Sequence, residues 1–269
     1  MIFLGDFIDR GPKIGEVLEI VRPMVEEGKA LAVMGNHELN ALAYHTEDSI
    51  ATGGFLRERS SKNVHQHRKT VEQLTTGELQ NHLDWFRTLH MWLDLDGLRV
   101  VHACWDEQAI NKINHALQEH DGITTSFLRA ACTKGNDLFD SVEIILKGKE
   151  TRLPHPHFFV DADGNVRHEI RSRWYLSPKN QTYRTYALQS DDVPCDVPLE
   201  ESLIGKASPY SMTAKPVFIG HYWLAADQPE ILADNVACLD YSVAKRGFLC
   251  AYRWHGEQKL KNEHFVRAS

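Results

Sequence analysis

The sequence has no hydrophobic run of the length that a membrane-spanning helix needs, which is about 18–20 residues. The first apolar run, residues 1–4, stops after four residues, and no basic residue precedes it. A start of this kind does not resemble a signal peptide. We therefore expect a protein with neither a membrane span nor a membrane partner.

Cysteine is also scarce, and its five copies show no sign of a disulfide framework. The number is odd, and no two cysteines have the CxxC spacing. Free thiols are typical of a reducing compartment, so we expect a cytoplasmic protein. The five residues are Cys104, Cys132, Cys195, Cys238 and Cys250.

Neither sign of charge dominates the chain, whose formal net charge is −7. A mildly acidic protein offers no broad basic face to a nucleic acid duplex, although one or two arginines could still hold a small phosphate-bearing ligand. The 42% of hydrophobic and 25% of charged residues are typical of a globular protein. The length of 269 residues fits one large domain or two small ones.

Strands and helices are predicted to alternate along the first 45 residues. Apolar runs at 2–4 and 29–34 read as buried strands, and helices are expected at 14–25 and 39–44. Pro23 is expected to kink or shorten the first helix. This alternation favours an α/β fold, in which ligands bind beyond the carboxyl ends of the strands.

The rest of the chain continues this pattern, with one interruption. Core strands are predicted at 98–103 and 216–221, helices at 63–90 and 106–147, and a closing pair of strands at 236–239 and 247–254. Residues 148–212 are rich in proline, arginine and aromatic residues and have weak periodicity. We interpret 1–269 as a single domain in which 148–212 form an insertion or cap.

Polar residues that can bind a metal ion follow four successive predicted core strands. Each taken alone has an ordinary explanation, such as a helix cap or a buried histidine, but four strand ends in a row indicate one site. Carboxylate, amide and imidazole groups suit Mn²⁺, Fe²⁺ or Zn²⁺, and the guanidinium of Arg10 fits phosphate. The residues are Asp6 and Asp9, Asn36 and His37, His102, and His221.

Two of these motifs carry a family resemblance. Gly5-Asp6-x-x-Asp9-Arg10-Gly11 and Gly35-Asn36-His37-Glu38 are similar to the second and third motifs of the calcineurin-like metallophosphoesterases. They look most like the phosphoprotein-phosphatase branch, which includes the bacterial symmetrical diadenosine tetraphosphate hydrolases. The histidines in 101–103 and 220–221 match the later motifs in order, and 238–254 resemble the tail of the bacterial enzymes.

The resemblance implies a layered β-sandwich flanked by helices and a metal-dependent hydrolase of phosphoric esters. By position, Asp6 would bridge two cations, and Asn36, His102 and His221 would complete the second cation's site. His37 would protonate the leaving group, with Asp9 to orient it and Arg10 to hold the phosphate. A metal-bridging hydroxide would attack phosphorus. The substrate would be a phosphomonoester, a phosphoprotein, or a nucleotide such as a dinucleoside polyphosphate.

The chain departs from the family pattern at the first cation's site. The first motif, Asp-x-His-Gly, is absent, and Trp223 stands where other branches have a second histidine. We therefore expect about one tightly bound cation. Two interpretations stay open: an N-terminal βα unit is missing from a shortened chain, or the chain works with one metal or none. The alternative function is that of a truncated, catalytically impaired homologue that binds metal or phosphate.

Several further residues are weaker candidates. A second phosphate-binding arginine is expected among Arg129, Arg171 and Arg173. The aromatic residues Trp174, Tyr175, Tyr183 and Tyr186 could stack on a base, or pack within the cap. A solvated surface is the favoured place for His45, His65 and His67, and Asp240 could orient His221 or end a strand. Cys104 is a weak candidate for a nucleophile.

Overall fold

A five-stranded sheet lies at the centre of the fold, in the order β12-β13-β11-β6-β5. The computed structural model describes residues 1–48, 54–160, 164–189, 193, 196–205 and 207–268. The three inner strands are parallel and the two edge strands are antiparallel to their neighbours. The strands are β5 (Trp92–Asp94), β6 (Arg99–Val101), β11 (Val217–Ile219), β12 (Ile231–Ala233) and β13 (Val236–Cys238).

Alternation along β11 explains why this sheet is buried on both faces. Val217 and Ile219 belong to the core on the helical side, whereas Phe218 belongs to the core on the other side. Successive side chains of a strand point to opposite faces, so the run Val-Phe-Ile serves two cores at once. The helices against the first face include α5 (Glu107–Glu119), α6 (Thr125–Cys132) and α7 (Asp137–Lys147).

A second, three-stranded sheet contributes to the other core. It consists of β14 (Asp240–Tyr241), β15 (Phe248–Tyr252) and β16 (Phe265–Ala268), all antiparallel. The rings of Phe218 and Tyr252 meet across the two sheets with centroids 5.1 Å apart. The predicted class, an α/β fold with a layered β-sandwich flanked by helices, is confirmed. The predicted pairing of 236–239 with 247–254 is wrong, because β13 pairs within the large sheet while β14 and β16 flank β15.

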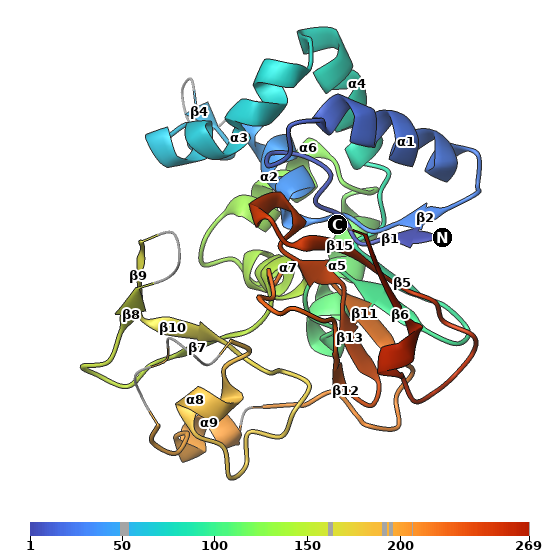
Figure 1. Cartoon of the computed structure of the whole chain (residues 1–269). Coiled ribbons are helices and arrows are strands. Elements are labelled where there is room, and N and C mark those ends of the chain that lie inside the picture. Colours follow the sequence, from blue (N-terminus) through green and yellow to red (C-terminus); the bar gives the residue numbers. More distant parts are fainter. Residues whose placement is uncertain (49–53, 161–163, 190–192, 194–195, 206, 269) are drawn as a thin grey trace.

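The N-terminal segment adds a parallel pair of strands and the helices above it (Figure 1). β1 (Ile2–Phe3) pairs with β2 (Leu31–Ala32), with α1 (Ile14–Glu26) between them in sequence. Contrary to expectation, α1 continues past Pro23, since the N–H of Glu27 still donates to the Pro23 carbonyl at 2.9 Å. After β2 comes α2 (Asn36–His45), which begins three residues earlier than predicted.

The expected long helix at 63–90 is two helices. They are α3 (Ser61–Gln73) and α4 (Thr76–Phe86), and Thr75 caps the second by accepting a hydrogen bond from the N–H of Glu78. Such an N-cap side chain satisfies a donor that the new helix would otherwise leave unpaired. A short hairpin of β3 (Glu47–Asp48) and β4 (Gly54–Phe55) precedes them.

Figure 1 shows, mostly in yellow, a lobe beside the two main sheets that is built from described residues within 148–212. The lobe contains β7 (Glu150–Arg152), β8 (Phe159–Val160), β9 (Val166–Arg167), β10 (Glu169–Arg171), α8 (Tyr183–Tyr186) and α9 (Glu201–Ile204). It has a small core of its own, which includes Ile170 and Tyr183. Trp174 and Tyr210 instead join the main core, so the lobe is tied to the sandwich by buried aromatic rings.

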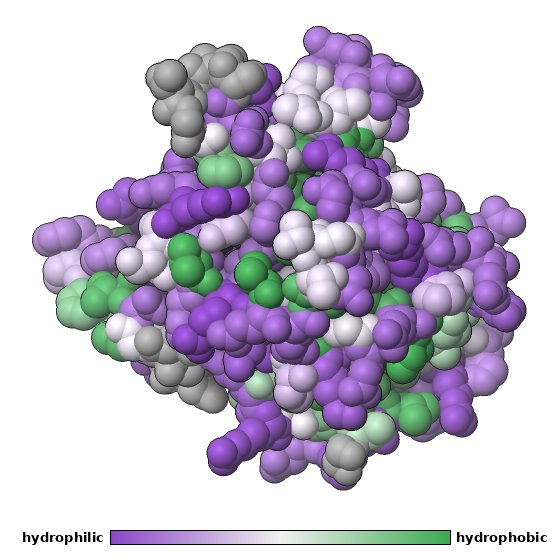
Figure 2. All heavy atoms as spheres, turned by 90° about the horizontal axis from the view of Figure 1, so that it is seen from above, coloured by the Kyte–Doolittle hydropathy of each residue, from purple (hydrophilic) through white to green (hydrophobic). Residues whose placement is uncertain are grey.

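The surface is mostly polar on the face shown in Figure 2, where hydrophobic side chains lie scattered among hydrophilic ones. Within the described residues, no helix has both the length and the apolar character to cross a membrane. Four of the five cysteines are free thiols, and Cys195 lies outside the described residues. Cys104 is fully buried, and burial raises the pKa of its thiol, which argues against a role as a nucleophile.

Candidate metal centre

Two glycines bring the ends of β1 and β2 into contact. Gly5 has a φ of +85°, and a Cβ atom on it would lie 2.3 Å from the backbone nitrogen of Gly35. A Cβ atom on Gly35 would lie 2.2 Å from Oδ1 of Asp6. Only glycine fits at either position, because any side chain would push the two loops apart. The polar residues after these strands therefore share one small space.

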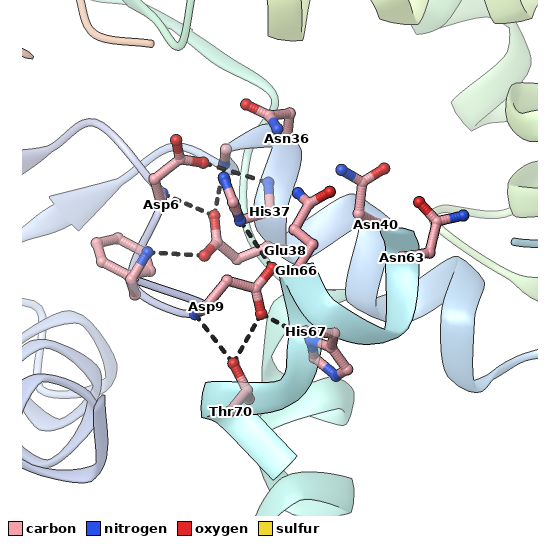
Figure 3. A network of polar contacts seen from close by, with 12 residues as sticks. Asp6, Asp9, Asn36, His37, Glu38, Asn40, Asn63, Gln66, His67 and Thr70 are labelled. Atoms are coloured by element: carbon pink, nitrogen blue, oxygen red, sulfur yellow. Dashed lines mark hydrogen bonds and ion pairs between the residues drawn. The ribbon is translucent and has the colours of Figure 1, made fainter. Parts of the chain in front are cut away.

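Glu38 fixes the loop that carries Asp6. Its carboxylate accepts hydrogen bonds from the backbone N–H groups of Asp6 at 2.8 Å, Phe7 at 2.8 Å and Gly35 at 2.9 Å (Figure 3). Burial and the charge of Asp6 raise the pKa of Glu38 to about 7, while the three donors favour its ionised form. Sequence reasoning gave Glu38 no role. Its signal is the capping pattern, an acidic residue three positions after the helix N-cap.

Asp6, His102 and His221 form a group whose possible ligand atoms all lie within 4.8 Å of one another. Nε2 of His102 is 3.3 Å from Oδ2 of Asp6. Asn36 completes the group, because its Oδ1 lies 2.8 Å from Nδ1 of His221 and 3.3 Å from Nε2 of His102. The structure thus brings together all four residues that the sequence suggested as ligands, from the loop after β1, from α2 and from the ends of β6 and β11.

These donors fit a divalent transition metal. Nδ1 of His102 lies 2.5 Å from the carbonyl oxygen of Leu4, so it donates there and leaves Nε2 to face Asp6. A backbone carbonyl behind a histidine is the usual way to orient a metal-binding imidazole. One carboxylate, one amide oxygen and two imidazoles form the mixed oxygen and nitrogen set that Mn²⁺, Fe²⁺ and Zn²⁺ accept.

The ionisable groups of this site shift one another's pKa values. Burial opposes ionisation of Asp6, but the neighbouring histidines, His102 foremost, hold its pKa well below the usual range. Burial likewise opposes protonation of His102, yet Asp6 raises its pKa to about 9. Burial and the charge of His102 lower the pKa of His221, which is therefore neutral. The site holds an anionic oxygen beside an imidazole that is already free to coordinate.

Asp9 lies three residues after Asp6 and forms a second cluster. Its Oδ2 is 2.7 Å from Nδ1 of His37, and its Oδ1 is 2.7 Å from Nδ1 of His67. The hydroxyl of Thr70 also donates to Oδ1 at 2.7 Å (Figure 3). Burial works against ionisation, but the hydrogen bonds from the two histidines lower the pKa of Asp9 to about 2. This buried carboxylate orients two imidazoles.

The expected solvated position of His67 is wrong. His67 is buried against Asp9, and its Nε2 lies 2.9 Å from Nε2 of the half-buried His45. His65, two positions earlier on α3, is exposed as predicted. The available signal was the spacing of His67 and Thr70, which puts both on one face of the helix. Nothing in the sequence indicated that Asp9 would lie against that face.

Arg10 is exposed and lies over the ring of Trp223, with its guanidinium carbon 4.5 Å from the ring centroid. The ammonium of Lys245 lies 4.6 Å from the centroid of the same ring. Trp223 is fixed in turn by Asp240, whose Oδ2 accepts a hydrogen bond from the Trp223 N–H at 3.0 Å. Asp240 therefore holds the backbone just after His221, rather than the His221 ring.

The three candidate arginines lie in different surroundings. Arg129 pairs with Asp48 at 3.2 Å, and Arg173 donates to the carbonyl of Ala187 at 3.0 Å. Arg171 donates to the carbonyl of Tyr222, the residue after His221, at 3.2 Å, so it contacts the loop of the candidate metal centre. The four aromatic candidates Trp174, Tyr175, Tyr183 and Tyr186 are buried and pack within the protein.

Comparison with known proteins agrees with this geometry. A model of the calcineurin-like phosphoesterase family matches residues 1–147, which is more than half of the chain. The matched region contains Asp6, Asn36 and His102 but ends before His221. No curated protein matches the chain significantly.

Proposed function

Because the chain belongs to the calcineurin-like phosphoesterases, a family of metal-dependent hydrolases of phosphoesters, we propose that it hydrolyses phosphoric esters itself. The observation that carries the proposal is the convergence of Asp6, Asn36, His102 and His221 beside the His37–Asp9 pair. One cluster has the donors for a cation and the other has a positioned imidazole. Together they supply the two things that cleavage of a phosphate ester needs.

The four ligand candidates would hold Mn²⁺, Fe²⁺ or Zn²⁺. When bound, such a cation lowers the pKa of water and neutralises charge on a phosphate group. The protein prepares this place by aiming Nε2 of His102 at Asp6 and by keeping His221 neutral. The described residues around Asp6 offer donors for a single cation, which supports one tightly bound metal in this chain.

His37 is the proposed general acid. Its Nδ1 is engaged by Asp9, which leaves Nε2 to exchange a proton with the substrate. Burial lowers the pKa of His37, but the charges of Asp6 and Asp9 outweigh burial and raise it. The imidazole thus carries the proton that a leaving alkoxide needs. His67 and Thr70 act on this step indirectly, because they hold Asp9 in place.

Arg10 and Arg171 are the proposed phosphate-binding residues. Stacking on Trp223 occupies one face of the Arg10 guanidinium and leaves its N–H edge to meet phosphate oxygens. Arg171 reaches the same region from the lobe, where Gln189 also donates to the carbonyls of Tyr222 at 2.8 Å and Trp223 at 3.0 Å. The lobe would therefore act as a cap that contributes to substrate binding.

The buried aromatic residues of the lobe favour one class of substrate within this proposal. With Trp174, Tyr175, Tyr183 and Tyr186 packed inside, the lobe offers none of these rings to a base. This favours a phosphomonoester or a phosphoprotein over a dinucleoside polyphosphate, with the chain in the phosphoprotein-phosphatase-like branch. The alternative, an impaired metal- or phosphate-binding homologue, is supported by the donor set for one cation.

A direct test measures phosphate release by the full chain with Mn²⁺. The substrates are p-nitrophenyl phosphate, a phosphoserine peptide and diadenosine tetraphosphate. We expect slow, chelator-sensitive turnover of the first two. His37→Asn should lower the rate on the peptide, and the exposed His65→Asn is the matched control. Absence of turnover in a chain that demonstrably holds the cation would overturn the hydrolase and support the impaired homologue.

A further inference from the structure

A second group of metal-ligand residues lies outside the metal centre. His255, Glu257 and His264 each offer a ligand atom, and these atoms all lie within 4.8 Å of one another. The first two follow β15, and the third ends the short 3-10 helix η2 (Asn262–His264) that precedes β16. The group therefore lies in the segment that connects β15 to β16.

Glu257 is held in place before any ligand arrives. Its Oε1 accepts a hydrogen bond from the Tyr252 hydroxyl at 2.9 Å and lies 2.7 Å from Nδ1 of His264. Its Oε2 accepts from the backbone N–H of His255 at 2.7 Å. Slight burial opposes ionisation, yet these hydrogen bonds lower the pKa of Glu257 to about 2. The carboxylate is thus an oriented anion between two imidazoles.

The turn that carries the group is anchored to the large sheet. The Trp254 indole donates to the backbone carbonyl of Glu257 at 2.9 Å. The Trp254 ring packs on Gly97, where an added Cβ atom would lie only 2.3 Å from it. Gly256 has a φ of +97°, which lets the chain turn between His255 and Glu257. The His255 and His264 rings face each other with centroids 4.8 Å apart.

The group is separate from the metal centre. It lies at the end of the β15–β16 pair where Tyr252 is opposite Phe265. Asp240, which contacts Trp223 beside the metal centre, pairs with Leu249. Leu249 and Tyr252 are three residues apart on one strand, a distance of about 10 Å at ~3.3 Å per residue. A ligand of the turn would leave the catalytic residues untouched.

We infer that His255, Glu257 and His264 form a structural Zn²⁺ site. Two imidazoles and one carboxylate are a common protein ligand set for zinc, with a water in the fourth position. The nitrogen donors disfavour Mg²⁺ and Ca²⁺, which prefer oxygen. Bound zinc would join the end of β15 to the start of β16, so it would stabilise the folded second sheet by mass action.

The test is zinc binding by the full chain, measured by equilibrium dialysis and metal analysis. To silence the metal centre, every variant carries Asp6→Asn. We expect about one zinc per chain in this background, a Tm that rises with zinc concentration, and loss of both when His255→Ala is added. His65→Ala, which removes an exposed histidine from α3, is the matched control and should keep the zinc.

His255 is the residue to change first because its ring is exposed and its removal threatens folding least. Co²⁺ provides a second readout, since its visible absorption in a site with nitrogen and oxygen ligands should disappear with His255→Ala. In the chain with an intact Asp6, His255→Ala should leave the rate on p-nitrophenyl phosphate unchanged. Equal zinc content and equal zinc-dependent Tm with and without His255 would overturn the site.

Discussion

Asp6 and Asp9 lie three residues apart on one loop, each at a positive φ and each beside histidines, yet their surroundings give them opposite properties. The Asp6 side chain is 23% exposed. Its Oδ1 accepts a hydrogen bond from the His37 backbone N–H at 3.2 Å, and its Oδ2 lies 3.3 Å from Nε2 of His102, so possible ligand atoms of two histidines gather beside it. The Asp9 side chain is 2% exposed, and donors occupy both of its oxygens. We expect the first arrangement to bind a cation and the second to orient imidazoles.

The difference comes from the elements that pack against each carboxylate. Strand ends deliver His102 and His221 to Asp6, whereas helix α3 delivers His67 and Thr70 to Asp9. Asp9 is buried, and its hydrogen bonds hold the imidazoles of His37 and His67 in place. Asp6 is partly exposed and lies among possible ligand atoms of two histidines, so it is the carboxylate that we expect to bind a cation. The residue type alone decides neither outcome.

The largest expected effect separates the two aspartates by activity. Asp6→Asn should reduce hydrolysis of p-nitrophenyl phosphate by roughly 10³-fold or more, comparable with loss of a main electrostatic contribution to catalysis. The substitution removes the anionic ligand of the proposed cation. The hydrogen bond from the backbone N–H of residue 6 to the Glu38 carboxylate is kept. Steady-state rates at saturating Mn²⁺ measure the effect. A rate within threefold of the wild-type rate, where about threefold is a fraction of one kcal/mol, would contradict the account.

Asp9→Asn should act more weakly and depend on the leaving group. The substitution leaves the ligands of the cation in place but removes the charge that orients His37 and raises its pKa. We expect kcat to fall roughly 10–100-fold for a phosphoserine peptide. This is less than the roughly 10²–10⁴-fold of a complete loss of general acid catalysis, because the His37 ring itself remains. The fall should be smaller for p-nitrophenyl phosphate, whose leaving group needs no proton. An equal fall on both substrates would argue against the acid role of His37.

Gly35→Ala tests the close approach that brings the two strand ends together. The new methyl group would meet Oδ1 of Asp6 at 2.2 Å and Oε2 of Glu38 at 2.7 Å. We expect a loss of about 1–3 kcal/mol in the free energy of unfolding, as for other overpacked sites, together with loss of the bound cation. Chemical denaturation measures the first. Gly77→Ala on α4, where a Cβ meets nothing within 4 Å, is the control and should not destabilise.

Acid should weaken the Asp9 cluster over a defined range of pH. The folded-state pKa of Asp9 is lowered from 3.8 to about 2, so its ionisation stabilises the folded protein above pH 3.8. The contribution, about 2 kcal/mol by linkage, should disappear as the pH falls through about 2. The stability difference between wild type and Asp9→Asn should therefore shrink between pH 5 and pH 2. A difference that stays constant over this range would show that the Asp9 charge does not stabilise the fold.

The sequence was sufficient for the strand ends and for the residues that follow them. Apolar runs bounded by glycine and polar residues are local signals, and a parallel sheet brings their carboxyl ends to one edge. This is why the neighbours of Asp6 could be named. The partners of Asp9 could not, because the contact of His67 depends on how α3 packs in three dimensions. The capping pattern of Glu38 was visible, but not its bonds to the Asp6 and Phe7 backbone.

The pairing of the last strands failed for a related reason. Residues 236–239 and 247–254 both have the composition of strands, but composition does not say which sheet a strand joins. The chain leaves the large sheet at Asp240. The Asp240 carboxylate accepts hydrogen bonds from the backbone N–H groups of Trp223 and Ser242. The stacking of Arg10 on Trp223 follows from that same turn and left no local signal.

The central claim is that Asp6 is a metal ligand and that Asp9 is not. Metal content per chain tests it most directly, measured after loading with Mn²⁺ and dialysis. The proteins are the His255→Ala variant, which lacks the second site, and the same variant with Asp6→Asn or with Asp9→Asn added. We predict about one bound ion in His255→Ala and in its Asp9→Asn derivative, and none in its Asp6→Asn derivative. Equal metal content in the two aspartate variants would contradict the account.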